Sequence, residues 1–82
     1  MTESSAEPTA KQGQYLAFIY NYTKINGQPP AQADMQDYFE VSPPTVHQMV
    51  MSLERDGYIS RVPRKARSLE ILIEPDAIPR LL

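Results

Sequence analysis

The 82-residue sequence offers few groups for catalysis or metal binding. Its sole histidine is His47, and it contains no cysteine, which excludes a disulfide, a thiolate zinc site and a cysteine nucleophile. Asp34 and Asp37 are one helical turn apart, a spacing typical of a solvated helix face rather than of a general acid–base pair. We see no nucleotide-binding loop and no nucleophile constellation, so we expect no enzyme activity, catalytic residue, metal, cofactor or small-molecule ligand.

The residues around His47 suit a different chemistry. In the helix expected there, Pro44 and Gln48 share one face with Thr45 and His47 at its edges, opposite an apolar stripe. A glutamine amide can pair with adenine in bidentate fashion, and apolar groups can contact a thymine methyl. The face is suited to reading base edges, although an ordinary exposed helix face explains this helix equally well.

Positive charge is concentrated just after this helix. The net charge of the chain is −2, but residues 55–67 carry five basic residues against Asp56, a local balance of +4, and the remainder carries −6. A polyanion responds to the local field as well as to the total charge. Taken alone, a solvated arginine-rich hairpin is the simpler interpretation. The basic residues are Arg55, Arg61, Arg64, Lys65 and Arg67.

The elements that must position these groups follow from the sequence pattern. Residues 1–8 are polar and acidic, which predicts a disordered N-terminal lead-in. Thr9 and Gln12 fit a capping box, so a helix is expected from there to the sequence NGQPP at 26–30. A short second helix is expected at about 31–39, followed by a tight turn. The first helix carries an apolar stripe of Tyr15, Phe18, Ile19 and Tyr22.

The third helix is expected over residues 42–56, and it begins with two consecutive prolines. The first N–H groups of a helix have no intrahelical partner, so Pro43 and Pro44 forfeit nothing there. With Ser42 as the N-cap, the cap hydroxyl must accept its hydrogen bond from the Thr45 amide, because Pro44 has none. Two missing amides also make this helix tip a poor cradle for phosphate.

Beyond Gly57 the pattern changes to short runs rich in β-branched residues. The sequences YISRV (58–62) and RSLEILI (67–73), separated by PRKA, predict a β-hairpin. The expected fold is therefore mainly α with a small β-hairpin: a winged helix-turn-helix, in which a wing follows a three-helix bundle. We expect this domain to span residues 9–73, with residues 74–82 as a C-terminal tail that packs on it or self-associates.

Three segments resemble a known family. The sequences KQGQYLAFIYNYTKINGQPP, MQDYFEVSPPTVHQMVMSLERDGYISR and KARSLEIL are similar to the N-terminal winged helix-turn-helix DNA-binding domain of LexA-type repressors. The most specific part runs from VSPPTV through LERDGYI to KAR. This resemblance implies a transcriptional regulator, a repressor rather than an activator, that binds double-stranded DNA sequence-specifically.

The resemblance also implies a division of labour on DNA. Helix 42–56 is expected in the major groove, and the wing, residues 62–67, on the backbone or in the minor groove. The expected recognition-helix contacts are Ser42, Pro44, Thr45, His47 and Gln48. The expected wing and backbone contacts are Arg61, Arg64, Lys65 and Arg67.

This chain departs from the family pattern in several places. Glu40 stands where the family's turn usually has glycine, and a left-handed Glu40 would be strained by about 1 kcal/mol. The usual hydroxyl cap and glutamate of the second helix are replaced by Ala31 and Asp34, so a weaker helix start is expected. The family's self-cleaving peptidase domain finds no counterpart in these residues, so we do not expect self-cleavage to carry over.

The competing function is a winged helix used for protein–protein interaction without specific DNA binding. The acidic balance of residues 1–54 and the apolar tail favour it, whereas the basic wing beside an uncharged helix face favours DNA. A weak homodimer is also expected, with Ile78, Leu81 and Leu82 as candidate contacts. No apolar run approaches the length of a membrane span, and we expect a soluble cytoplasmic protein, associated with the nucleoid in a bacterium.

Overall fold

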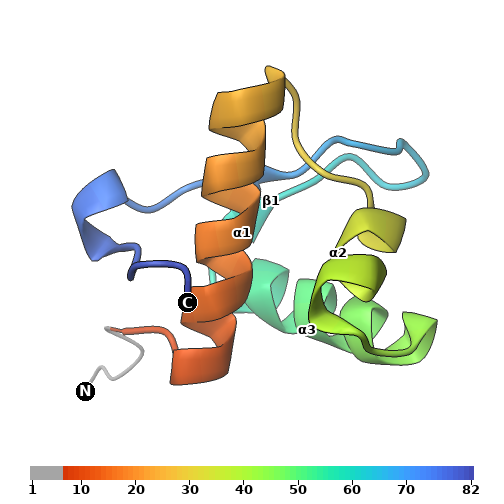
Figure 1. Ribbon diagram of the computed structural model, residues 1–82, viewed down its shortest axis with the longest axis horizontal. Coiled ribbons are helices and arrows are strands. Elements are labelled where there is room, and N and C mark those ends of the chain that lie inside the picture. The colour runs from red at the N-terminus through yellow and green to blue at the C-terminus, as the bar shows by residue number, and fades with distance from the viewer. Residues whose placement is uncertain (1–6) are drawn as a thin grey trace.

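The computed structural model describes residues 7–82, so most of the predicted lead-in at 1–8 lies outside the described residues. Three helices pack around one core and are followed by a two-stranded hairpin. Figure 1 shows that the C-terminal segment returns to the first helix. This is the predicted architecture. The elements are α1 (Ala10–Asn26), α2 (Gln32–Phe39), α3 (Pro43–Arg55), β1 (Ile59–Ser60), β2 (Glu70–Ile71) and the 3-10 helix η2 (Pro75–Ala77).

The ends of α1 follow the predicted signals. The Thr9 hydroxyl accepts a hydrogen bond from the Gln12 amide, and the Gln12 side chain accepts one from the Thr9 amide, each at 3.0 Å. This capping box satisfies donors that a helix start otherwise leaves unpaired. Gly27 ends the helix in the left-handed conformation, with φ 76°, which glycine adopts without a side-chain penalty.

Helix α2 begins without a hydroxyl cap, as the sequence predicted, but its first turn is not left open. The Asp34 carboxylate reaches back and accepts a hydrogen bond from the Ala31 amide at 2.8 Å. At the other end Glu40 is left-handed, with φ 55° and ψ 52°, and the chain turns directly into α3. The strain expected of a non-glycine residue is therefore present at this turn.

The core lies where α1, α3 and the hairpin meet. Leu16, Val46, Val50 and Leu53 are completely buried, so the predicted apolar faces of α1 and α3 pack toward each other. From α2, Met35 is also completely buried. The rings of Tyr15 and Phe39 stack with centroids 4.0 Å apart, and this contact joins the end of α2 to the start of α1.

The hairpin is antiparallel as predicted, but its strands are shorter than the predicted runs 58–62 and 67–73. Ile59 pairs with Ile71 and Ser60 with Glu70, and each strand has two residues. Beyond Ser60 the ladder gives way to a side chain: the Ser68 hydroxyl accepts from the Val62 amide at 3.0 Å and donates to its carbonyl at 3.2 Å. Leu69, Ile71 and Ile73 alternate along the second arm of the hairpin; Leu69 is part of the core, and Ile71 and Ile73 pack against it.

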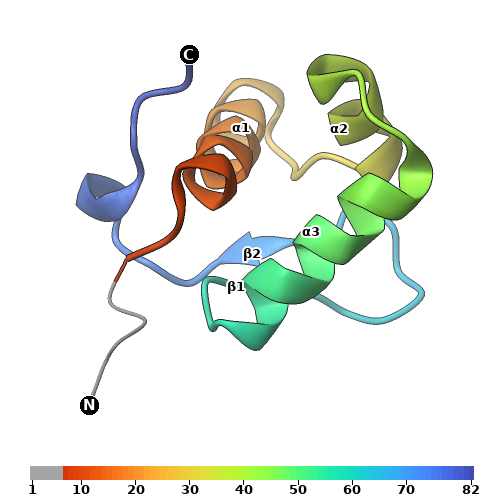
Figure 2. The same cartoon turned by 90° about the horizontal axis from the view of Figure 1, so that it is seen from below.

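The tail, residues 74–82, docks along α1. The Gln14 side chain donates to the Arg80 carbonyl and accepts from the Leu82 amide, each at 2.9 Å. Gly13 provides the space for Pro79, because a Cβ at Gly13 would lie 2.8 Å from the Pro79 Cγ. The tail therefore packs on the domain, and it lies on the far side of α1 from the wing loop (Figures 1 and 2).

Candidate nucleic-acid interface

The start of α3 has a fixed geometry, although not through the bond that the sequence predicted. The Thr45 amide donates to the Ser42 carbonyl at 3.1 Å, and the Ser42 hydroxyl does not cap the helix. That hydroxyl lies 2.9 Å from the Thr45 hydroxyl instead. The expected side-chain cap was wrong, because a backbone carbonyl already satisfies the one available amide and leaves the hydroxyl to its neighbour.

The outward face of α3 is exposed and carries no Lys, Arg, Asp or Glu over its first two turns. Pro44, Thr45, His47 and Gln48 are all exposed, while Val46 on the opposite face is completely buried. An amide, an imidazole and hydroxyl groups can donate and accept hydrogen bonds, and the proline ring is apolar. The structure thus brings these predicted contacts, together with the exposed Ser42, onto one surface.

The wing loop presents two of its four predicted basic residues to solvent. Arg64 has φ 67°, and the Lys65 amide bonds to the Val62 carbonyl at 3.1 Å, so the chain reverses at the wing tip. Arg64 and Lys65 are exposed and form no ion pair within residues 7–82. They form the wing tip that a polyanion would meet first.

The side chain of Arg61 contacts residues of α3. Its Nε donates to the Glu54 carboxylate at 3.0 Å, and its Nη2 lies 3.2 Å from the sulfur of Met51 on the outer face of α3. The side chain of Arg61 is 20% exposed. The ion pair connects the hairpin to α3, and the Glu54 carboxylate offsets the positive charge of Arg61, which the sequence predicted to contact DNA.

Arg67 is also turned toward the protein. Its Nη1 lies 3.1 Å from the Asp34 carboxylate, 3.1 Å from the Tyr22 hydroxyl and 3.4 Å from the Pro29 carbonyl. The hydrogen bond to Tyr22 raises the pKa of Arg67, and the Asp34 carboxylate adds to this increase. The predicted free cation is therefore paired with two groups of α1 and α2 and with the segment between them.

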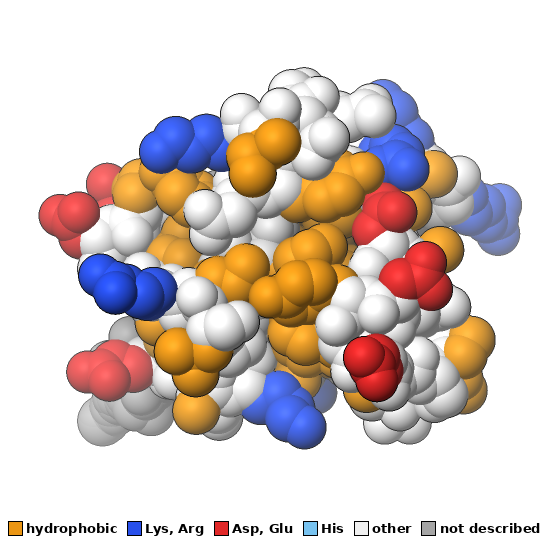
Figure 3. Space-filling view, viewed as in Figure 1, with side chains coloured by type: hydrophobic (Ala, Val, Ile, Leu, Met, Phe, Trp, Pro, Cys, Tyr) orange, Lys and Arg blue, Asp and Glu red, His pale blue; other side chains and the backbone are white. Residues whose placement is uncertain are grey.

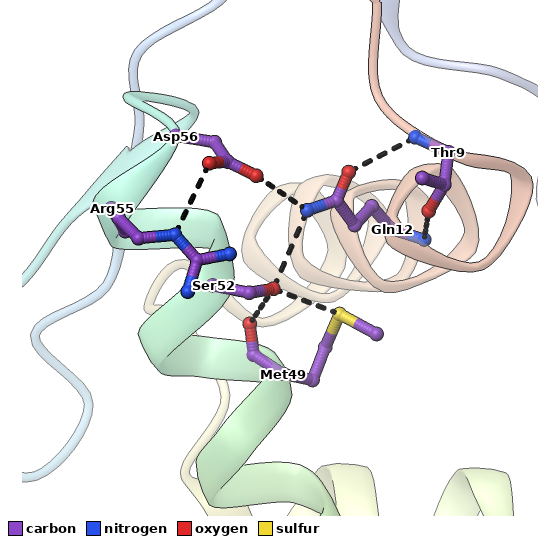
Figure 4. Close-up of polar contacts among 6 residues, drawn as sticks. All are labelled: Thr9, Gln12, Met49, Ser52, Arg55 and Asp56. Atoms are coloured by element: carbon purple, nitrogen blue, oxygen red, sulfur yellow. Dashed lines mark hydrogen bonds and ion pairs between the residues drawn. The ribbon is translucent and has the colours of Figure 1, made fainter. Parts of the chain in front are cut away.

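The sequence did not indicate the polar contact that joins α1 to the end of α3. Gln12 is buried, with 7% of its surface exposed, and its amide donates to Asp56 at 2.9 Å and to Ser52 at 3.3 Å (Figure 4). Gln12 precedes Tyr15, Leu16 and Ile19 by three, four and seven residues. That spacing places it on the buried stripe and could have revealed it.

Acidic side chains lie beside the wing. Figure 3 shows red side chains over α2 next to the blue side chains of the wing region. The acidic residues of α2 and its C-cap are Asp34, Asp37 and Glu40. Because acidic groups repel phosphate, the α2 side of the wing is unfavourable to a polyanion.

These features define the class of the protein. Two helices joined by a tight turn, with the second presenting an exposed face and followed by a hairpin, constitute a winged helix-turn-helix domain. Residues 8–66 match the family described as iron dependent repressor, N-terminal DNA binding domain, and the chain belongs to this family.

Curated relatives carry the same region within longer chains. The LexA repressor of Thermosipho melanesiensis is 37% identical over 70 residues, which cover 85% of this chain and 35% of the relative. The LexA repressor of Thermosipho africanus is 35% identical over 72 residues, which cover 88% of this chain and 36% of the relative. This chain thus spans about a third of the length of these relatives.

The family description mentions iron, but residues 7–82 do not provide a site for a metal ion. Between residues 7 and 82 no group of three or more His, Cys, Asp or Glu could hold a metal ion, and His47 is exposed on α3. None of the described helices is long and apolar enough to cross a membrane.

Proposed function

We propose that this domain binds double-stranded DNA sequence-specifically in the manner of LexA-type repressors and acts in transcriptional repression. The family is one of repressor DNA-binding domains, and two repressors share 35% and 37% identity with most of this chain. In this proposal α3 enters the major groove, and the wing at 62–67 follows the backbone or the adjacent minor groove.

One observation carries the proposal. Over residues 42–48 the exposed face of α3 has hydrogen-bonding groups but no Lys, Arg, Asp or Glu. It is followed along the chain by a wing tip with two exposed cations, Arg64 and Lys65, which form no ion pair within residues 7–82. Glutamine amides, hydroxyls and apolar groups can read base edges in the major groove, and exposed cations can bind the phosphates that position the domain. The fold divides these two tasks between adjacent elements.

The proposal assigns roles within that surface. Gln48 reads a base edge through its amide, while Pro44 and Thr45 offer apolar contacts and a hydroxyl to the same groove. His47 contacts a base or a phosphate, and Ser42 supports the helix start through Thr45. Because two prolines remove amides from this helix tip, phosphate binding falls mainly to Arg64 and Lys65.

Selection of binding sites from random duplexes, followed by titration of the best site at several salt concentrations, tests this function. Each neutralised phosphate contributes about −0.9 to the slope of log K against log salt, so two wing contacts predict a slope of about −2. If no duplex in the library shows salt-sensitive binding, the proposal is wrong.

We also propose that two copies bind a palindromic site, because two-fold dimers on such sites are common for this type of fold. Of the three candidate contact residues in the tail, Leu81 packs partly against the core of its own chain. Ile78 is half-buried and Leu82 is 92% exposed, so these two residues are the candidates for the contact between copies.

A further inference from the structure

Arg67 lies at the base of the wing, where three groups from other parts of the chain surround one nitrogen. Its Nη1 contacts Tyr22 of α1, the carbonyl of Pro29 and the carboxylate of Asp34 in α2, all within 3.4 Å. Its guanidinium carbon also lies 5.9 Å from the centre of the Tyr22 ring. These contacts fasten the wing to α1, to α2 and to the segment between them.

The anchor in α2 serves a second element at the same time. The Asp34 oxygen Oδ2 that pairs with Arg67 also accepts the hydrogen bond from the Ala31 amide. Since Ala31 is the N-cap of α2 and offers no side-chain acceptor, this carboxylate satisfies a donor at the start of the helix-turn-helix. One atom therefore joins the start of α2 to the wing.

The backbone conformation of the wing loop depends on the contacts that hold the loop in place. Arg64 and Arg67 both have positive φ, 67° and 57°, a conformation that residues with a side chain adopt only when their surroundings hold them there. The paired ladder ends at Ser60 and resumes at Glu70. Between these points Arg61 connects one arm of the wing to α3 through Glu54, and Arg67 connects the other arm to α1 and α2. Arg67 therefore helps to determine where Arg64 and Lys65 point.

We infer that Arg67 is a positioning residue that holds the wing against the helix-turn-helix through Asp34, rather than a direct contact to phosphate. Moving Arg67 onto a phosphate would leave the Asp34 carboxylate unpaired beside the polyanion and would release the Ala31–Asp34–Arg67 connection. Both changes oppose binding. The consequence for affinity rests on the proposed DNA-binding function, whereas the wing geometry does not.

The direction in which Asp34→Asn changes DNA affinity separates a positioning role of Arg67 from a direct contact to phosphate. Asp34→Asn removes a negative charge but keeps a side-chain oxygen for the Ala31 amide. Asp37→Asn removes the same charge from the same helix at an exposed position that forms no ion pair within residues 7–82, and it is the matched control. If Arg67 positions the wing, Asp34→Asn weakens DNA binding by about three- to tenfold, whereas Asp37→Asn leaves it equal or tighter.

If Asp34→Asn binds DNA as tightly as Asp37→Asn or more tightly, Asp34 does not anchor the wing and the inference is wrong. Arg67→Gln removes the other member of the same ion pair, and its DNA affinity is measured in parallel. The double variant Asp34→Asn with Arg67→Gln should then bind no more weakly than the weaker single variant, because both changes break one contact. Losses that add fully would show two independent contributions and would also overturn the inference.

Amide hydrogen exchange without DNA provides a readout that does not depend on the proposed function. We expect Asp34→Asn and Arg67→Gln to accelerate exchange at the Val62 and Lys65 amides, which bond within the wing, and to leave the Val50 amide in α3 protected. Asp37→Asn should change none of them. Unchanged wing exchange in both test variants would refute the positioning role, even in a protein that binds no DNA.

Discussion

The side-chain amide of Gln12 lies 2.9 Å from the carboxylate of Asp56, the C-cap residue of α3, so the first turn of α1 is bonded directly to the end of the exposed helix (Figure 4). The same amide nitrogen lies 3.3 Å from the Ser52 hydroxyl, which in turn donates to the Met49 carbonyl. The orientation of α3 relative to α1 therefore depends on a polar contact at the edge of an apolar core.

Replacing Gln12 with alanine should destabilise the fold by about 1–3 kcal/mol, because it removes a buried side chain that donates to Asp56 and Ser52 and it opens the capping box. Urea unfolding followed by circular dichroism measures the change. Thr9→Ala is the control, since it removes a hydrogen bond of the cap but leaves the contact to Asp56 intact. Equal losses in the two variants would show that the link to α3 contributes nothing.

The docking of the tail depends on the absence of a side chain at Gly13. Gly13→Ala favours the helix by up to about 1 kcal/mol, but its Cβ would lie 2.8 Å from the Pro79 Cγ, so we expect the tail to detach. The Leu82 amide, held by Gln14, should then exchange rapidly while the core amides stay protected. Gln14→Ala should detach the tail without any clash. A Leu82 amide that stays protected in Gly13→Ala would contradict this account.

Glu40 adopts the left-handed conformation at the turn between α2 and α3. Glu40→Gly should therefore raise the free energy of unfolding by about 1 kcal/mol, because glycine carries no steric penalty there. The matched control is Glu40→Ala, which removes the same charge but keeps the Cβ. If both variants gain equally in thermal or urea unfolding, the charge rather than the backbone is responsible.

Gln48 and the wing tip should differ in how they affect DNA specificity. Gln48→Ala should relax the preference at one base position and weaken binding to the best site by roughly 1–3 kcal/mol. Arg64→Ala or Lys65→Ala should instead weaken all sequences alike and reduce the salt slope by about 1. Parallel titrations on the selected site and on single-base variants test both. Equal losses on every site for Gln48→Ala would show that it reads no base.

The proposed dimer should depend on the exposed end of the tail. We expect two copies on a palindromic duplex and a loss of paired binding in the variant Ile78→Ser with Leu82→Ser, because the apolar contact between copies is removed. Analytical ultracentrifugation with and without the duplex measures this. Strictly one copy on every duplex would remove the dimer from the proposal.

The sequence alone determined the helix boundaries and the buried helix faces. A capping box at Thr9, glycine after α1 and prolines at the first positions of α3 act within a few residues, and the structure has each of these helix boundaries where the pattern predicted them. The apolar spacing likewise identified the buried faces of α1 and α3, because helical periodicity is a property of the chain itself. The exposed face of α3, with Pro44 and Gln48, followed from the same geometry.

Only the tertiary structure decided how the charged and polar side chains are used. Arg61 and Arg67 looked like free cations in the sequence, yet each finds a carboxylate that lies far from it along the chain or on another element. Gln12 finds Asp56, and Gln14 finds the tail. Such pairings depend on which helices and loops pack together in the fold, and the local sequence pattern does not contain that information. The fold thereby reduced a basic stretch of five residues to the two exposed cations of its wing tip, Arg64 and Lys65, together with Arg55, whose guanidinium lies beside the neighbouring Asp56.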